Sequence, residues 1–343
     1  MIDYEQLYQA YESDGFYSLQ LEIGDICHQG CVYCYMNAMP KEKNRLTDDT
    51  IRDILYDAKK LGVNAIEWLG GEPLLRDSVF SHLQYASELG FRNNMWTGGL
   101  PLSEPEILEK TAYNCRNGLI SIHVSTINEK LYEIMHPGRS MMDLAKILSA
   151  VRKLLQSGYP ASQILNSVTY TGMQSAKDMI QTMKYFKQNF GIITSLNVYH
   201  TYLRPEDQNE LLEVYIPKEK ETQKIYNFYK KLYGVNNMPL NCVNKQYCSA
   251  TAAVLSDGSV TPCATIREKD APNVNTDGRL EEIINNRKDY LTFKVFKNPL
   301  NLPDDCSLCA LKDQCWGCRS RSFAAGLGLY GKDPRCFRKK KQG

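Results

Sequence analysis

The sequence has almost no excess of charge, no long apolar run and no repeated or low-complexity segment. Its 41 Lys and Arg residues stand against 39 Asp and Glu residues, a net charge of +2, so electrostatics gives no reason to expect a nucleic-acid partner. No uninterrupted apolar run approaches the roughly 18 residues of a transmembrane helix, so we expect no membrane span. Residues 1–5 contain neither a basic nor an apolar signal region, so we expect no secretory signal.

Cysteine is the abundant residue type, with 12 in 343 residues. This density is below that of a small disulfide-stapled domain and too high for chance buried thiols. A chain without a signal or a membrane span is expected in the reducing cytoplasm, where clustered cysteines usually bind metal or do redox chemistry. With 43% hydrophobic residues the chain can bury a sizeable core, which excludes a largely disordered protein.

The first 235 residues alternate strand patterns with amphipathic helix patterns. Strands are predicted over 18–23, 65–69, 92–97, 119–125, 164–170 and 192–199, and helices over 48–61, 79–89, 105–113, 143–156, 176–188 and 218–233. Six strand–helix units in a row predict an α/β fold with a parallel sheet, curved into a partial (β/α)6 barrel or left open. In either case the active site should lie at the carboxyl ends of the strands.

Residues 236–343 have a different character, with little helical periodicity, short apolar runs and eight cysteines. We therefore predict two domains. Residues 1–235 would form the barrel, and residues 236–343 would form a small cysteine-rich domain organised around metal rather than around a large core.

Three cysteines follow the first predicted strand, in a C-x3-C-x2-C spacing formed by Cys27, Cys31 and Cys34. Three thiolates on one short loop can surround a single metal centre, and Gly30 relaxes the backbone for that curl. A cubane 4Fe–4S cluster has four irons, so three cysteines leave one iron open for a substrate. A zinc site completed by His28 or by a distant ligand is the alternative.

The second predicted strand runs directly into the tetrapeptide Gly70-Gly71-Glu72-Pro73. Two glycines at a strand end allow the backbone to approach a ligand closely, and Glu72 can receive an ammonium group. In isolation the same residues also suit a plain tight turn before a helix that Pro73 starts. The two motifs at the tips of adjacent strands are much less common together.

Together these motifs resemble the radical S-adenosylmethionine (radical SAM) superfamily, whose C-x3-C-x2-C motif has an aromatic residue before the last cysteine, here Tyr33. The resemblance implies a 4Fe–4S cluster on the three cysteines, with S-adenosylmethionine chelated by the open iron. One electron from an external donor of the flavodoxin or ferredoxin type would then yield a 5′-deoxyadenosyl radical, which abstracts a hydrogen atom from the substrate.

The resemblance also implies which residues contact the cofactor. Gly70, Gly71 and Glu72 would position the methionine amine, the backbone near Tyr33 would contact the adenine, and Ser125 would contact the cofactor from the fourth strand.

The C-terminal cysteines include two C-x2-C pairs, which is the ordinary spacing of a zinc ribbon. A zinc ribbon would leave four cysteines of this region without a role. Their full order resembles the SPASM domain of radical SAM maturases, although the usual third gap, C-x3-C, is here one residue shorter at Cys315-x2-Cys318. By this resemblance one auxiliary 4Fe–4S cluster would be held by Cys242, Cys248, Cys263 and Cys318, and a second by Cys306, Cys309, Cys315 and Cys336. Cys115 is left over, and we expect a plain buried thiol.

Full cysteine ligation suggests that the auxiliary clusters carry electrons, so the resemblance implies an oxidoreductase. SPASM proteins mostly modify peptide or protein side chains through crosslinks, thioethers or other oxidations, and some relatives dehydrogenate or dehydrate small molecules such as aminocyclitols. Ala264 stands where the sulfatase-maturating branch has an Asp base, which argues against formylglycine formation. About 17 residues precede the first strand, too few for a folded leader-recognition domain. A peptide substrate would then need a separate leader-binding protein or recognition by the barrel itself.

Polar side chains on the fourth predicted strand could face the substrate, because Ser121, His123 and Ser125 share one face by the period of two. His123 is either a base, a substrate contact or a hydrogen-bonded barrel residue. Two other classes of protein stay open at this point. A zinc-binding interaction module has no use for the Gly-Gly-Glu loop, and an electron-transfer protein would keep its activity after replacement of Cys27.

Overall fold

A computed structural model describes residues 2–36, 38, 44–199, 213–235 and 243–338. Its strands are β1 (Ser18–Glu22), β2 (Ala65–Leu69), β3 (Arg92–Thr97), β4 (Leu119–His123), β5 (Ile164–Tyr170), β6 (Ile193–Val198), β7 (Thr251–Val254) and β8 (Val260–Thr261). They form one eight-stranded sheet in the order β6-β5-β4-β3-β2-β1-β7-β8. All neighbouring pairs are parallel except β7 with β8.

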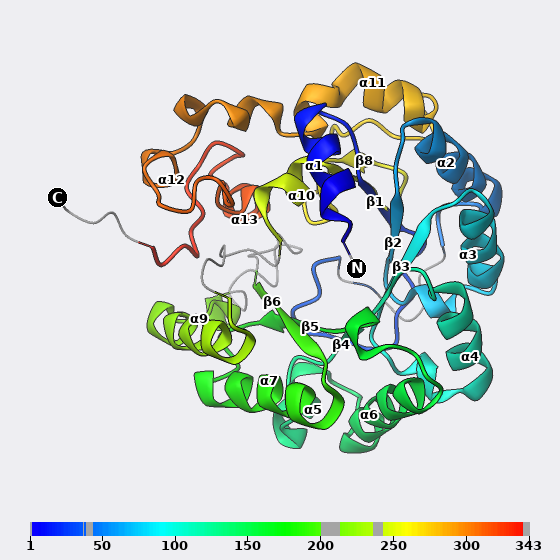
Figure 1. Cartoon of the computed structure of the whole chain (residues 1–343), viewed down its shortest axis with the longest axis vertical. Coiled ribbons are helices and arrows are strands. Elements are labelled where there is room, and N and C mark those ends of the chain that lie inside the picture. Colours follow the sequence, from blue (N-terminus) through cyan, green and yellow to red (C-terminus); the bar gives the residue numbers. More distant parts are fainter. Residues whose placement is uncertain (1, 37, 39–43, 200–212, 236–242, 339–343) are drawn as a thin grey trace.

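The helices include one after each of the six predicted strands, as expected. They are α1 (Tyr4–Glu12), α2 (Asp48–Lys60), α3 (Val79–Glu88), α4 (Pro105–Asn114), α5 (Glu129–Met135), α6 (Met141–Gln156), α7 (Ala176–Phe190), α9 (Glu219–Tyr233), α10 (Lys245–Ser249), α11 (Leu280–Leu291), α12 (Asp304–Ser307) and α13 (Arg319–Ala324). Short 3-10 turns lie at Pro73–Leu75, Pro101–Ser103, Ala161–Gln163, Glu213–Tyr215, Lys294–Lys297 and Pro299–Asn301. In Figure 1 the larger helices surround the curved sheet. Helices α12 and α13 lie on the left of this view, between α9 and α10.

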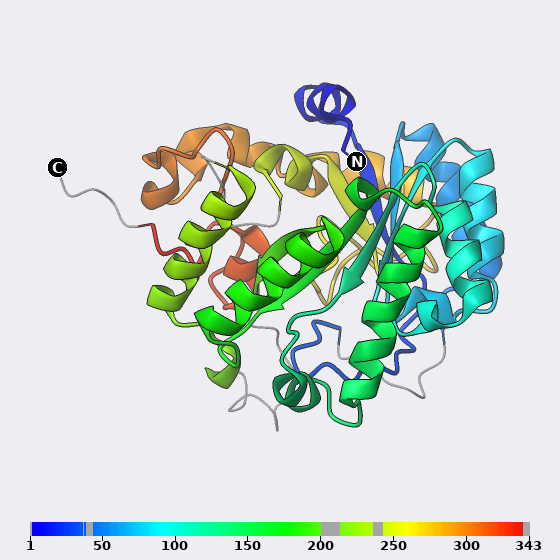
Figure 2. The ribbon, with the colours of Figure 1, turned by 60° about the horizontal axis from the view of Figure 1, so that its bottom comes forward.

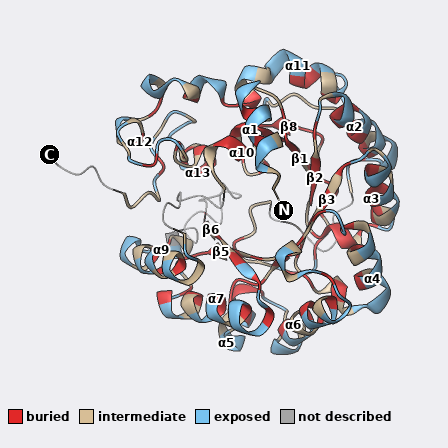
Figure 3. Ribbon diagram, viewed as in Figure 1, coloured by how far each residue is buried: buried red, intermediate tan, exposed pale blue. Residues whose placement is uncertain are grey.

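The predicted partial (β/α)6 barrel is confirmed. Local signals account for its element boundaries: the Thr47 side chain caps α2 by accepting from the Thr50 amide at 3.1 Å, and two acidic residues follow in the first turn. The strands are buried and the outer faces of the helices are exposed, as Figure 3 shows. Apolar residues of the sheet and of the helices around it form one large core, which includes Leu21, Trp68 and Ile147.

The C-terminal region is more helical than the sequence suggested. Helix α11 covers twelve residues, and it packs with Leu280, Ile283, Ile284 and Leu291 in the same core as the barrel. Its backbone is non-helical at Arg287. Within the described residues, no helix is long and apolar enough to cross a membrane.

The sheet also continues across the predicted domain boundary. Strand β7 pairs in parallel with β1, from Ser18 opposite Thr251 to Leu21 opposite Val254. The Arg279 side chain anchors α11 to α2, with a guanidinium nitrogen 2.8 Å from the buried carboxylate of Asp57. A division into two domains at residue 235 stays a prediction, and the residues before and after this position contact one another extensively.

Candidate functional site

The loop that carries the first three cysteines begins where β1 ends, and hydrogen bonds tie it to the loop after β2. The Gly71 amide donates to the Gly24 carbonyl at 2.9 Å, and the Glu72 amide donates to the Ile26 carbonyl at 2.8 Å. Figure 2 shows the segment after β1 below the arrowheads of the strands. The two motifs therefore meet at the carboxyl ends of the strands, where the sequence placed the site.

The two glycines are required by a close approach of one chain segment to the other. A Cβ on Gly70 would lie 2.5 Å from the Gly24 carbonyl oxygen, and a Cβ on Gly71 would lie 2.3 Å from that of Ile26. Gly70 also has φ +141, a conformation that side chains disfavour. From the sequence we expected these glycines to admit a ligand. In the structure they admit the backbone that leads into the cysteine loop.

Burial and neighbouring charges raise the pKa of two of the three thiols of this loop. Burial raises the pKa of Cys27 to about 12, and the charges of Glu72 and Cys34 raise it further. Burial also raises the pKa of Cys31 well above its ordinary value, and Cys34 and Cys27 add to the effect. Bound iron would reverse this preference, because a nearby cation stabilises thiolates. All the described cysteines are free of disulfide bonds.

The carboxylate of Glu72 is buried and already accepts three hydrogen bonds. Its Oε2 accepts from the Thr97 hydroxyl at 2.8 Å and the Gly98 amide at 2.7 Å, and its Oε1 accepts from the Leu74 amide at 3.2 Å. Burial raises the pKa of Glu72 to about 7, against the lowering effect of these bonds. A cationic amine beside this carboxylate would hold it ionised.

Tyr33 is buried, and its hydroxyl is the meeting point of three polar side chains. Its Oη lies 2.9 Å from His123 Nε2, 3.0 Å from His136 Nε2 and 3.2 Å from Ser125 Oγ. The structure thus brings together Tyr33, His123 and Ser125, which the sequence singled out separately. His136 was missed, because a single histidine after α5 carries no pattern that points to this contact.

The protonation state of His136 follows from its partners. Nδ1 lies 2.9 Å from the Tyr132 carbonyl oxygen, which can only accept, so Nδ1 carries a proton. Burial lowers the pKa of His136 to about 4, so the ring is neutral near pH 7 and Nε2 is an acceptor. Burial and the neighbouring His136 lower the pKa of His123 to about 3. These contacts favour the hydrogen-bonded barrel role for His123 over the role of a base.

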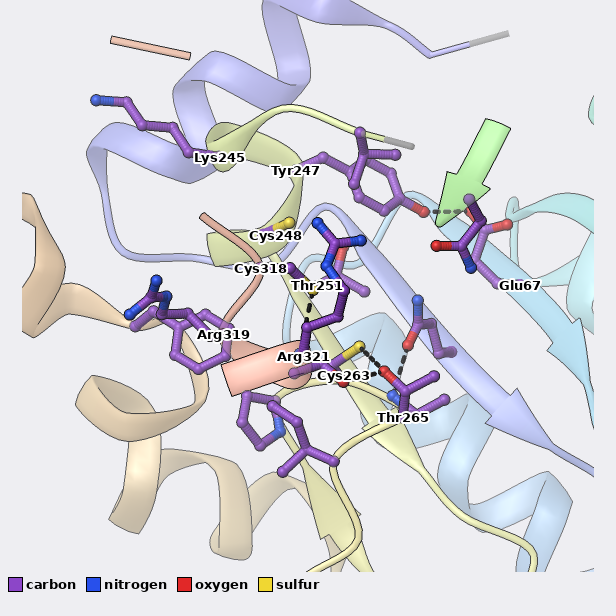
Figure 4. A pocket seen from close by; sticks show the side chains of 18 of the residues that line it. Glu67, Lys245, Tyr247, Cys248, Thr251, Cys263, Thr265, Cys318, Arg319 and Arg321 are labelled. Carbon is purple, nitrogen blue, oxygen red and sulfur yellow. Dashed lines mark hydrogen bonds between the residues drawn. The ribbon is translucent and has the colours of Figure 1, made fainter. Parts of the chain in front are cut away.

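The described C-terminal cysteines line two separate cavities. Cys306, Cys309, Cys315 and Cys336 line one. Cys248, Cys263 and Cys318 line the other, which has a volume of about 210 Å³ and is shown in Figure 4. Cys242 lies outside the described residues. The grouping is the one that the SPASM resemblance implies, and the ligand sets themselves stay a prediction.

A site for a single metal ion has a different geometry from a site for a four-iron cluster. Over the described ranges, no group of three or more His, Cys, Asp or Glu side chains is arranged to hold one metal ion. Ligands of a four-iron cluster lie farther apart than ligands of one ion, because each cysteine binds a different iron. Cys115 is fully buried in the hydrophobic core, as expected of a plain thiol.

The cavity of Cys248, Cys263 and Cys318 reaches the barrel interior, where Glu67 and Asn197 line it. The buried Glu67 carboxylate accepts from Tyr247 Oη at 2.7 Å, as the dashed line in Figure 4 shows. It also accepts from the indole of Trp96 at 2.7 Å and from Asn94 at 2.8 Å. These hydrogen bonds hold the Glu67 side chain in place at the edge of the cavity.

A second buried carboxylate links the cysteine loop to the C-terminal region. Glu22, at the end of β1, accepts from Tyr35 Oη at 3.0 Å and from an Arg267 guanidinium nitrogen at 2.6 Å. The Arg267 guanidinium also lies over the Tyr35 ring, 5.4 Å from its centroid. One anion therefore joins β1, the residue after Cys34 and the loop after β8.

Comparison with known proteins agrees with this geometry. The model of the radical SAM superfamily matches residues 21–211. A "Probable GTP 3′,8-cyclase" of Methanococcus aeolicus is 26% identical over 283 residues, and the match covers 78% of this chain and 91% of that protein. The mycofactocin maturase MftC of Mycobacterium ulcerans is 22% identical over 337 residues, 93% of this chain and 87% of that protein.

Among solved structures, Streptococcus suis SuiB bound to its precursor peptide SuiA superposes with a TM-score of 0.63 at 16% identity. The match covers 96% of this chain and 78% of that one. At this level of identity the likeness shows a shared fold.

Proposed function

Because the chain belongs to the radical SAM superfamily, we propose that it is an oxidoreductase with two auxiliary clusters that modifies a peptide or protein side chain. The observation that carries the proposal is the division of the C-terminal thiols between two cavities, with four in one and three described thiols in the other. Eight C-terminal cysteines, Cys242 included, would complete two cubane clusters.

The residues present suit the first cluster and S-adenosylmethionine. Cys27, Cys31 and Cys34 would hold the cluster, and Glu72 would receive the methionine amine with Gly70 and Gly71 beside it. When bound, these groups would supply a 5′-deoxyadenosyl radical, and the auxiliary clusters would supply an acceptor for the electron left on the substrate. The chain itself holds the thiols on one loop and keeps the side chains of Glu72 and Tyr33 buried.

Two similarities support a peptide substrate. MftC, which is named as a maturase, aligns with nearly the whole chain, and the peptide-bound SuiB shares its fold. We further propose that a separate protein binds the leader of the peptide and that a flavodoxin- or ferredoxin-type protein delivers the electron.

Iron content and cofactor cleavage test the proposal. The anaerobically purified full chain is expected to hold about 12 iron atoms, four per cubane. With a reductant it should convert S-adenosylmethionine to 5′-deoxyadenosine. A fully loaded protein that forms none would exclude the enzyme assignment, and zinc in place of iron in the C-terminal region would exclude the auxiliary clusters.

The peptide is then identified by mass spectrometry. Short peptides with Cys, Tyr or Trp encoded beside the gene are the candidates. A product lighter by two hydrogens indicates an oxidation or crosslink. An unchanged mass with deuterium taken up from solvent would indicate epimerisation instead.

A small-molecule substrate is the second candidate, and the similarity to a protein named as a GTP 3′,8-cyclase favours it. Incubation of the loaded enzyme with GTP, and separately with aminocyclitols or sugars, tests this candidate. Consumption of one of these compounds in step with 5′-deoxyadenosine formation would replace the peptide proposal.

A further inference from the structure

Arg319 is a buried arginine whose donors are only partly used. It is the first residue of α13, directly after Cys318, and only 4% of it is exposed. One terminal nitrogen donates to the Leu329 carbonyl at 2.7 Å and the Gly331 carbonyl at 3.0 Å. Its Nε and its other terminal nitrogen, NH2, are buried without a hydrogen-bond partner in the described structure. Buried donors without partners are uncommon, because each costs the free energy of its lost hydration.

Its charge is also unbalanced. Among the described residues, no carboxylate forms an ion pair with Arg319, whereas Arg321 on the same helix is paired with the buried Asp333. The Arg321 guanidinium contacts both oxygens of that carboxylate, at 3.0 Å and 2.7 Å. A buried cation without an anion is strongly unfavourable, so an anion is expected beside Arg319.

The cavity of four thiols offers such an anion. Gly317 lies between that cavity and Arg319: a Cβ on Gly317 would lie 2.7 Å from the unpartnered Arg319 NH2 and 3.4 Å from Cys306 Sγ. Arg319 also borders the cavity of Cys248, Cys263 and Cys318, but in Figure 4 its guanidinium points away from Cys263.

We propose that Arg319 is the counter-cation of the cluster held by Cys306, Cys309, Cys315 and Cys336, and that it makes this cluster the more easily reduced of the two auxiliary clusters. The inference rests on the proposed function, since it requires both clusters. A cubane with four thiolates is anionic, and reduction adds a further negative charge that a buried cation stabilises. At the cavity of Cys248, Cys263 and Cys318, the charge of Arg321 is already balanced by Asp333.

The test is a redox titration of the full chain, loaded anaerobically with iron and sulfide and followed by electron paramagnetic resonance. Cys27, Cys31 and Cys34 are replaced with Ala, so that only the auxiliary clusters contribute to the spectrum. Two midpoint potentials are expected. In Arg319→Gln the ratio of reduced to oxidised higher-potential cluster, measured at a fixed potential, should fall at least tenfold. This corresponds to a shift of the midpoint potential by about 59 mV for one electron. The lower potential should not move.

The matched control is Lys332→Gln. Lys332 also lines the cavity of four thiols, but its ammonium is half exposed and is paired with Asp305, so its removal should shift the potential far less. Equal shifts in both variants, no shift in Arg319→Gln, or a shift of the lower potential alone would each overturn the proposal. A sample without auxiliary clusters would instead overturn the proposed function.

Arg319→Lys is the second variant, for the case in which the Arg319→Gln protein does not incorporate its clusters. A lysine keeps the charge, so this variant should retain about eight iron atoms in the same background, four per cubane, and a potential near that of the parent. Loss of the second cluster from both variants would mean that Arg319 acts through packing, which contradicts the proposal.

Discussion

The Tyr33 hydroxyl donates its proton to Nε2 of His136 across 3.0 Å. Since Nδ1 of His136 is protonated towards Tyr132, the neutral ring accepts at Nε2. Nε2 of His123 lies 2.9 Å from Tyr33 Oη and 3.2 Å from Ser125 Oγ, so it has two hydroxyl partners. This chain of neutral groups fixes the aromatic side chain that precedes Cys34.

Replacement of Tyr33 by Phe should lower stability without changing the shape of the side chain. It leaves the acceptor Nε2 of His136 without its hydroxyl partner, at a cost of about 1–3 kcal/mol. The thermal unfolding midpoint of the loaded protein should fall by a few degrees. Tyr8→Phe is the control, since Tyr8 is exposed on α1 and its variant should unfold at the wild-type temperature.

The two histidines should make the protein sensitive to mild acid. Their pKa values are lowered in the folded state, to about 4 for His136 and about 3 for His123, so the unfolded chain binds more protons below pH 6.5. The contribution of the two neutral histidines to stability is therefore fully present above pH 6.5. It is lost as the pH falls towards their pKa values in the folded state. Between pH 7 and pH 5, His136 alone accounts for about 2 kcal/mol.

The comparison of His136→Gln with the parent isolates this effect. Glutamine cannot take up a proton, so the variant should lose less stability than the parent between pH 7 and pH 5. The readout is the unfolding midpoint at each pH. Parallel curves for the two proteins would show that His136 is not buried neutral.

Glu72 should give S-adenosylmethionine binding a pH dependence. Its pKa is raised to about 7 by burial, so the carboxyl is partly protonated at neutral pH, and a cationic amine must displace that proton. Affinity, measured by equilibrium dialysis with cluster-loaded protein, should rise from pH 6 to pH 8. Glu72→Gln should bind about ten- to a hundredfold more weakly, because one charge-assisted hydrogen bond is lost, and its affinity should not vary over this range.

Glu106→Gln provides the control for that experiment. Glu106 is an exposed residue of α4 whose carboxylate pairs with Lys110. Affinity and its pH dependence should match the parent. If Glu72→Gln also matched the parent, the amine would be held elsewhere.

The buried pair of Arg321 and Asp333 should be essential to the C-terminal region. Asp333 accepts from Arg321 and from the Cys318 amide at 2.9 Å, so it joins the segments that carry Cys318 and Cys336. The charge of Arg321 lowers the Asp333 pKa to about 2 although burial raises it. Asp333→Asn leaves a buried cation without its anion, which costs about 3–5 kcal/mol.

Iron content and limited proteolysis read out this loss. The Asp333→Asn protein should retain the iron of the first cluster and lose iron from the C-terminal region, which should become protease-sensitive. A double variant with Arg321→Met and Asp333→Leu removes both charges, so it should be less destabilised than the single variant. Equal damage in both would assign the effect to packing.

Most of the barrel could be predicted from the sequence because its signals are local. The alternating pattern predicted the strands at 65–69, 92–97 and 164–170 with the bounds that the structure has. A capping threonine predicted the start of α2. The grouping of C-terminal cysteines followed from a family pattern of spacings. Neither required knowledge of distant contacts.

What could not be predicted depends on tertiary contacts. The pairing of β7 with β1 joins segments more than 200 residues apart, and nothing in either segment specifies the partner. His136 and Arg319 have no motif, and their roles come from what surrounds them in the fold. The glycines of the β2 loop were recognised, but their close approach to the backbone of Gly24 and Ile26 could not be read from the sequence.

The position of β1 between β2 and β7 sets the distance between the two parts of the site. On one side β2 leads to the Gly-Gly-Glu loop, and on the other β7 lies between Cys248 and Cys263. The spacing of the cysteine groups is thus fixed by adjacent hydrogen-bonded strands instead of by a linker. A chain cut at residue 235 would leave β1 as an open edge, exposing to aggregation the very strand from which the cysteine loop begins.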